Sequence, residues 1–141
     1  MSIFDIFRKD YLHYRGVDVF KKGVLLFEKA EYSPALERFQ TALSLLKRAK
    51  IEQHKKNELI INTLSIISRT HKEMCQFDQA EQCLLTAISI NPNDAGLYES
   101  MGFLKLDQKQ FDLAIPWFEK IIMINPTEPD GYYWKGVVLL N

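Results

Sequence analysis

The side chains best suited to nucleophilic catalysis or metal binding are few and far apart in this sequence. The three histidines stand at positions 13, 54 and 71, and the two cysteines are Cys75 and Cys83. The spacing of these two cysteines is neither that of a redox-active pair nor that of a zinc site. The sequence has no Gly-rich phosphate loop, no His-Glu metal pair and no nucleophile elbow. We therefore predict that the chain is not an enzyme and holds no metal ion or cofactor.

The charges of the whole chain balance, with 18 Lys and Arg against 18 Asp and Glu. This balance argues against nucleic acid as a partner, because phosphate binding is largely a charge effect. The basic run from Lys47 to Lys56 is interpreted as a solvated loop and helix ends. No apolar stretch approaches the ~20 residues that a membrane span needs, and residues 2–9 lack the order of a secretory signal. With only two cysteines, a reducing compartment fits, and we predict a cytoplasmic protein.

The strongest feature of the sequence is a repeat. The Asn-Pro pair at 91–92 recurs at 125–126, and the segment that begins at Phe77 recurs at Phe111 with the same offset. Each copy has an aromatic residue, an alanine three positions later, and apolar residues four, seven and eight positions after the alanine, which is one face of a helix. The alanines are Ala35, Ala80 and Ala114.

A second helical stripe precedes each alanine helix, so each repeat is predicted to be a pair of helices. A small residue stands in the middle of each first helix, where glycine costs about 1 kcal/mol relative to alanine. A cost repeated at a fixed place indicates close approach of the paired helix, and we expect the three alanines to face these positions. The small residues are Gly23, Ser68, Gly102 and Gly136. His71 lies on the same stripe and is predicted to be a hydrogen-bonded structural histidine.

The predicted domain covers residues 16–141, in units of about 16–50, 58–92 and 95–126 and a half unit at 129–141. Ala35 and Ala80 are further apart than Ala80 and Ala114, and the additional residues between Lys47 and Glu58 are mostly charged. We expect longer helices here, not a flexible insertion. Residues 1–15 form a separate amphipathic segment or short N-terminal helix, whose apolar face is expected to cap the repeats. Filling the groove of the domain or touching a membrane surface are the alternatives. That face comprises Ile3, Phe4, Phe7, Tyr11 and Tyr14.

These residues resemble the tetratricopeptide repeat, a unit of about 34 residues. The second unit departs from the family pattern with Ser68 in place of glycine, and the first has Lys47 where the proline would fall. The resemblance covers residues 16 to 141 and implies an all-α solenoid of antiparallel helix pairs in a right-handed superhelix. It also implies a concave face lined by the first helix of each unit, which binds a peptide or helix. The third unit matches best, at Tyr98, Met101, Gly102, Phe111, Ala114, Phe118 and Pro126.

The residues predicted to face this groove lie on the first helices but off the packing stripe. They form an apolar, aromatic surface with a basic centre, which suits an apolar-anchored segment with an acidic group. Burial of the aromatic residues by neighbouring helices is the alternative. The Lys and Asn clamp of repeats that grip heat-shock chaperone tails is absent, because Phe20 and Val24 occupy two of its sites. The predicted groove residues are Phe20, Val24, Phe27, Asn62, Ser65, Arg69, Lys72, Glu99, Phe103, Leu106 and Tyr133.

The last helix is apolar most of the way round, although a closing helix should have a polar outer face. Either the array is longer, or this face meets another molecule, for example in a homodimer. The possible oligomer face is Trp134, Val137, Val138 and Leu140.

Three functions are therefore considered. The first is an adaptor or assembly scaffold that binds a peptide or helix of another protein. The second is a small cytoplasmic chaperone for an aggregation-prone client, since short three-repeat secretion chaperones have this size. The third is a structural homo-oligomer formed through the last helix.

Overall fold

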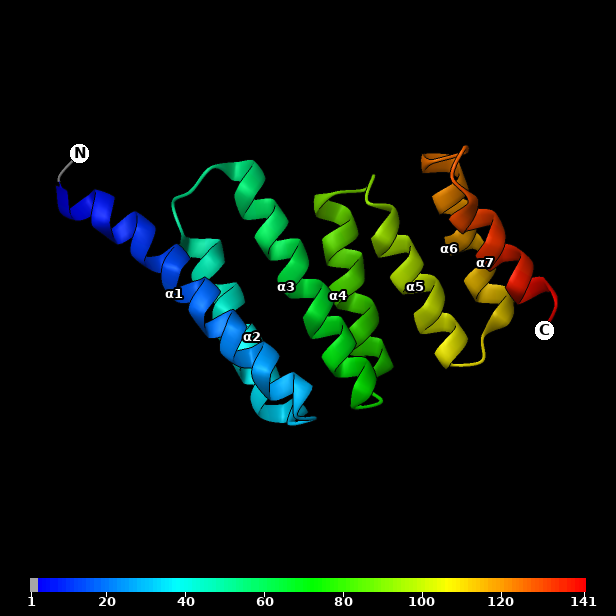
Figure 1. Cartoon of the computed structure of the whole chain (residues 1–141), viewed down its shortest axis with the longest axis horizontal. Coiled ribbons are helices and arrows are strands. Elements are labelled where there is room, and N and C mark those ends of the chain that lie inside the picture. The colour runs from blue at the N-terminus through cyan, green and yellow to red at the C-terminus, as the bar shows by residue number, and fades with distance from the viewer. Residues whose placement is uncertain (1–2) are drawn as a thin grey trace. The chain divides into compact units, whose positions relative to one another are not determined.

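The prediction of an all-α fold is confirmed. The computed structural model describes residues 3–141, and the side chains of residues 5–10 lie outside that description. Within 3–141 it contains seven α-helices and no strand (Figure 1). Their bounds are α1 Ile3–Glu28, α2 Tyr32–Arg48, α3 Gln53–Glu73, α4 Phe77–Ile90, α5 Ala95–Asp107, α6 Phe111–Ile124 and α7 Pro129–Leu139.

The helices gather into two compact units. Unit 1 ends at Gln76 and contains α1, α2 and α3, with α2 packed against both of the others. Unit 2 begins at Phe77 and contains α4 to α7, each packed against the next helix along the chain. The boundary falls between α3 and α4, so the two helices of the second repeat lie in different units.

The turns between the two helices of the three repeats share one backbone conformation. Ala30, Cys75 and Lys109 each adopt a positive φ, of 60°, 58° and 57°. In every case the following residue donates its N–H to a carbonyl five positions back, as Gln110 does to Lys105 at 2.9 Å. This is the Schellman ending of a helix, which satisfies carbonyls that the helix leaves unpaired.

Gly23 and Gly102 do meet the paired helix, and the atoms nearest to them belong to a residue other than the predicted alanine. A Cβ built at Gly23 would stand 2.7 Å from Cε1 of Phe39, and one built at Gly102 would stand 2.6 Å from Cε1 of Phe118. The nearest atoms thus belong to the aromatic residue four positions after the alanine. An aromatic ring can lie against the backbone of the paired helix only where that helix has no side chain, as at a glycine.

The longer helices expected between the first two repeats are confirmed. The second helix, α2, runs 17 residues and α3 runs 21, and only residues 49–52 separate them. Ala49 is fully buried directly after α2. The charged residues of this region therefore extend helices and leave no long loop.

The N-terminal segment is not a separate helix, because α1 runs without a break from Ile3 to Glu28. Gly16, at the expected boundary, is buried, and a Cβ there would stand 3.0 Å from two atoms of Leu46. The absence of a side chain at Gly16 therefore allows close contact with α2, and the helix continues through this residue. Ile3, Phe4, Tyr11 and Tyr14 are exposed, and the side chain of Phe7 lies outside the described residues.

Candidate partner-binding surface

The predicted groove residues of α1 are half-buried against the rest of unit 1. Phe20 packs on Phe39 with ring centroids 5.6 Å apart, and Phe27 packs on Tyr32 at 5.4 Å. Val24 is also half-buried. Each of the two rings therefore packs against a neighbouring ring and keeps part of its surface accessible.

The α3 residues bring polar groups to the same unit. The guanidinium of Arg69 lies 5.1 Å from the ring centroid of Phe27, which joins the predicted residues of α1 and α3 through a cation–π contact. Asn62 is exposed, and Ser65 is half-buried with its hydroxyl donating to the Ile61 carbonyl at 2.9 Å. Lys72 is half-buried.

A pocket of about 230 Å³ opens in unit 1 beside two of the predicted residues. Four of its lining residues are apolar, two are small polar residues of α3, and one is a lysine. The hydroxyl of Thr63 is already used, since it donates to the Leu59 carbonyl at 2.7 Å. The pocket is thus an apolar recess with the exposed amine of Lys21 beside it. It is lined by Val17, Phe20, Lys21, Leu46, Leu59, Asn62 and Thr63.

The balanced net charge conceals a strong division of charge. Residues 1–76 contain 14 Lys and Arg against 9 Asp and Glu, whereas residues 77–141 contain 4 Lys and no Arg against 9 Asp and Glu. Unit 1 is therefore basic and unit 2 is acidic. The whole-chain count in the sequence analysis missed this division, although a count for each half would have found it.

One carboxylate of unit 1 is held by a local ion pair. Lys22 lies 2.8 Å from Asp18 one turn away, and this hydrogen bond is the main reason that the pKa of Asp18 is below its ordinary value. Both side chains are on the surface, so the pair contributes little to stability. Asp18 consequently remains ionised and partly offsets the basic charge near the pocket.

In unit 2 the predicted groove residues form an aromatic cluster with α7. The ring of Phe103 lies edge-on to Trp134 at 4.7 Å and to Phe118 at 5.9 Å. The indole Nε1 of Trp134 donates to Oε1 of Glu99 at 3.0 Å. Leu106 is half-buried against the same core, while Tyr133 is exposed and touches Trp134 at 4.9 Å. Glu99 and Phe103 thus fix α7 on α5.

The residues of the possible oligomer face do not lie on one exposed surface. Val138 is buried in the core of unit 2, and Trp134 and Val137 are half-buried. Leu140 alone of the four is exposed. The exposed side of α7 and its end instead carries Tyr132, Leu139 and Leu140.

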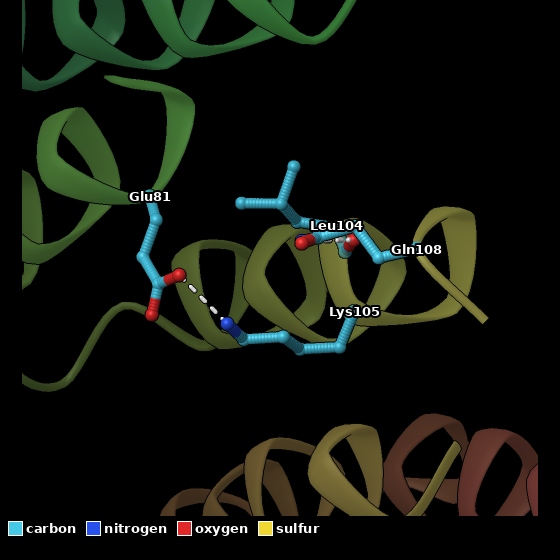
Figure 2. Close-up of polar contacts among 4 residues, drawn as sticks. All are labelled: Glu81, Leu104, Lys105 and Gln108. Carbon is cyan, nitrogen blue, oxygen red and sulfur yellow. Dashed lines mark hydrogen bonds and ion pairs between the residues drawn. The ribbon is translucent and has the colours of Figure 1, made fainter. Parts of the chain in front are cut away.

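A partly buried ion pair joins α4 to α5. Nζ of Lys105 lies 2.7 Å from Oε2 of Glu81, and the side-chain amide of Gln108 donates to the Leu104 carbonyl at 3.0 Å. Figure 2 shows these four residues and both contacts. Lys105 occupies the packing stripe of α5, and its side chain is only 11% exposed. A charge in this place needs its partner, because an unpaired buried ammonium is costly.

The residues considered first for chemistry have structural surroundings. Nδ1 of His71 lies 2.7 Å from Oε1 of Gln76, which confirms the prediction of a hydrogen-bonded structural histidine. Burial raises the pKa of the Cys83 thiol, whereas Cys75 is exposed in a turn. Among the described residues, no three His, Cys, Asp or Glu side chains gather as a metal site would require. None of the described helices is long and apolar enough to cross a membrane.

Comparison with known proteins agrees with the helix pairs. A family model of the tetratricopeptide repeat matches residues 62–94 and 95–128. Anaphase-promoting complex subunit cut9 of Schizosaccharomyces pombe is 24% identical over 106 residues, which are 75% of this chain and 15% of that protein. The chain therefore spans less than a sixth of the length of this relative.

Solved structures show the same fold. Cut9, in the APC/C hetero-tetramer Cut9–Hcn1, gives a TM-score of 0.74 at 22% identity, covering 89% of this chain and 24% of that one. The Arabidopsis OM64 TPR domain gives 0.70 at 16% identity, covering 92% and 98%. The first TPR of Spaghetti (RPAP3), bound to the HSP90 peptide SRMEEVD, gives 0.67 at 12% identity, covering 90% and 92%.

Proposed function

Because this chain belongs to the tetratricopeptide-repeat family, we propose that it is a protein-binding module which takes a segment of a partner on the α1 and α3 surface of unit 1. The relevant residues are those of the pocket and its surroundings, namely Val17, Phe20, Lys21, Asn62 and Arg69. The biological setting is an adaptor or an assembly scaffold.

The pocket is the observation that carries this proposal. Its volume of about 230 Å³ is smaller than the roughly 300–1,000 Å³ usual for small-molecule sites. Its apolar lining suits one aliphatic or aromatic side chain, and residues of α1, α2 and α3 all contribute to it. A pocket of this kind is where an anchor residue of a bound peptide inserts.

Charge defines the rest of the partner segment. Lys21 and Arg69 are exposed, and the basic residues of unit 1 outnumber the acidic ones by 14 to 9. Complementary charge speeds association and selects among partners. We therefore expect an apolar anchor next to Asp or Glu.

We do not expect this chain to bind the peptide that the RPAP3 domain binds. That repeat domain is bound to an acidic heat-shock peptide, but the Lys and Asn clamp implied by the family resemblance is replaced here by Phe20 and Val24. The segment that we expect on this chain is also acidic, but an apolar pocket takes the place of a polar clamp.

Affinity capture from a lysate of the source cell tests the proposal. Asn62→Trp places a large ring over the pocket from an exposed position, and Lys21→Glu reverses the charge beside it. Lys55→Glu is the matched control, because it makes the same charge change at an exposed position outside the pocket lining. A partner retained by the parent and by Lys55→Glu, but lost from both pocket variants, supports the proposal. Retention by all four proteins contradicts it.

A further inference from the structure

Helix α7 repeats α5 in detail, one repeat unit later in the sequence. The hydroxyl of Tyr98 donates to the Pro92 carbonyl at 2.8 Å, and the hydroxyl of Tyr132 donates to the Pro126 carbonyl at 3.1 Å. Gly136 likewise corresponds to Gly102. The stripe that α5 presents to its paired helix is therefore formed a second time on α7.

This stripe is covered on α5 and open on α7. Tyr98 is 8% exposed and its counterpart Tyr132 is 52% exposed. Lys105 is 9% exposed and its counterpart Leu139 is 63% exposed. The space beside Gly102 is filled by the ring of Phe118, whereas a Cβ built at Gly136 would meet nothing within 4 Å.

The α6 residues that cover the α5 stripe indicate which kind of helix would fit on the α7 stripe. In α6, Trp117 stacks on Tyr98 with centroids 6.2 Å apart, and Phe118 enters the space that Gly102 leaves. Ala114, four positions before Phe118, is fully buried in the same cluster. The required pattern is thus a small residue followed four positions later by an aromatic one.

One residue pair beside the α7 stripe is apolar where its counterpart at α5 is charged. The pair Glu81 and Lys105 corresponds, one repeat unit later, to Ile115 and Leu139, which line one open pocket of about 460 Å³. Buried Val138 forms part of the same lining. The stripe therefore ends beside a recess of mixed lining, in which two apolar residues stand where α5 has an ion pair.

We propose that the stripe formed by Tyr132, Gly136 and Leu139 is a docking site for an amphipathic helix of a partner protein. That helix carries a small residue and, four positions later, an aromatic residue that enters the notch at Gly136. Basic residues flank it, because unit 2 has nine Asp and Glu against four Lys and no Arg. This site is on a different unit from the pocket of the proposed function and does not depend on it.

A synthetic peptide of residues 110–126 with two lysines added at each end is a suitable probe, because α6 already makes this contact on α5 and the lysines supply the basic flanks. Protein with isotope-labelled glycine gives one amide NMR signal for each of its six glycines. Titration is expected to shift the Gly136 signal and to leave those of Gly16 and Gly23 in place. A peptide with Phe118→Ala is the matched control and should bind at least about tenfold more weakly, because it lacks the ring.

Gly136→Ala provides the second test. A methyl group fits the folded protein at this position, since nothing lies within 4 Å. It also fills the notch, so peptide affinity should fall at least about tenfold while helicity is kept. Equal binding by the parent and Gly136→Ala, or a shift of Gly102 in place of Gly136, contradicts the proposal. A dimer of the parent that Gly136→Ala abolishes would make a second copy the occupant and would also overturn it.

Discussion

Gly102 lies directly against the ring of Phe118, and a Cβ at this glycine would stand 2.6 Å from Cε1 of that ring. Gly23 and Phe39 repeat the relationship in unit 1, and Gly136 is the same position without its aromatic partner. Two of the three glycines of this motif therefore face an aromatic ring and the third does not, and alanine substitutions can distinguish the two cases.

Gly102→Ala and Gly23→Ala are each expected to destabilise the fold by about 1–3 kcal/mol, because the new methyl group overpacks an aromatic ring. Gly136→Ala is expected to stabilise it by up to about 1 kcal/mol, since it gains helix propensity in open space. Urea unfolding followed by circular dichroism measures all three. If all three substitutions changed the free energy of unfolding in the same direction, the open space beside Gly136 would not explain the difference between these glycines.

The partly buried pair of Glu81 and Lys105 gives the second prediction. Either Glu81→Ile or Lys105→Leu alone should destabilise the protein by about 1–3 kcal/mol, because the remaining charged group loses its partner. The double variant Glu81→Ile with Lys105→Leu copies the apolar pair found one repeat unit later, and it should recover most of the loss. A double-mutant cycle of unfolding free energies measures the coupling. Additive losses would contradict a direct pair.

The positive φ of Lys109 gives the third prediction. A lysine in the left-handed region bears a steric cost that glycine does not, so Lys109→Gly should stabilise the protein by about 0.5–1 kcal/mol. Gln108→Gly is the control, because the neighbouring residue has a φ of −84° and gains nothing from glycine. Thermal unfolding of the two variants should shift in opposite directions. A loss of stability in Lys109→Gly would mean that the turn is not left-handed.

The two thiols should differ in reactivity. Burial shields Cys83 and raises the pKa of its thiol, while Cys75 is exposed. A raised pKa keeps Cys83 in the neutral form at mildly alkaline pH, and only the thiolate is nucleophilic. Alkylation in mildly alkaline buffer should therefore modify Cys75 at least about tenfold faster. Mass spectrometry of the digested protein identifies the residue, and Cys75→Ser should remove the fast phase. Equal rates would contradict the burial of Cys83.

The same pKa shift has a consequence for stability. Because the pKa of Cys83 is higher in the folded protein than in the unfolded chain, its favourable contribution is complete below the unfolded value. That contribution is lost as the pH rises through the folded value. Alkaline destabilisation should therefore be weaker in Cys83→Ala than in the parent, after correction for the difference between them at neutral pH. Urea unfolding across the alkaline range measures this, and parallel losses in the two proteins would contradict it.

Periodicity alone located the helix pairs, because alanine followed by apolar residues at four, seven and eight positions occurs on one face of a helix and nowhere else in a regular backbone. The longer α2 and α3 also followed from the continuing stripe. The aromatic ring that fills each glycine notch was not foreseen, since sequence spacing gives the face of a side chain but not its reach. The boundary predicted between residues 15 and 16 was wrong, because α1 continues through Gly16, which lies against Leu46 of α2.

Only part of the candidate surface could be predicted from the sequence. The predicted residues Phe20 and Asn62 come together because α1 and α3 both pack against α2, an arrangement that follows from the repeat. The pocket between them also needs Leu46 and Leu59, which belong to other faces, and no pattern in the sequence connects these four residues. The sequence showed that α7 is unusually apolar, but it did not show which side of the helix is exposed. That side depends on Val138, which is buried in the core of unit 2.

Selection from a random peptide library on the immobilised chain is the most direct test of the unit 1 surface. We expect the selected peptides to share one large apolar residue next to Asp or Glu, to bind Lys55→Glu as they bind the parent, and to be lost from Asn62→Trp and Lys21→Glu. Enrichment of basic peptides, or equal binding by the parent and both pocket variants, would contradict an apolar anchor site in a basic surface.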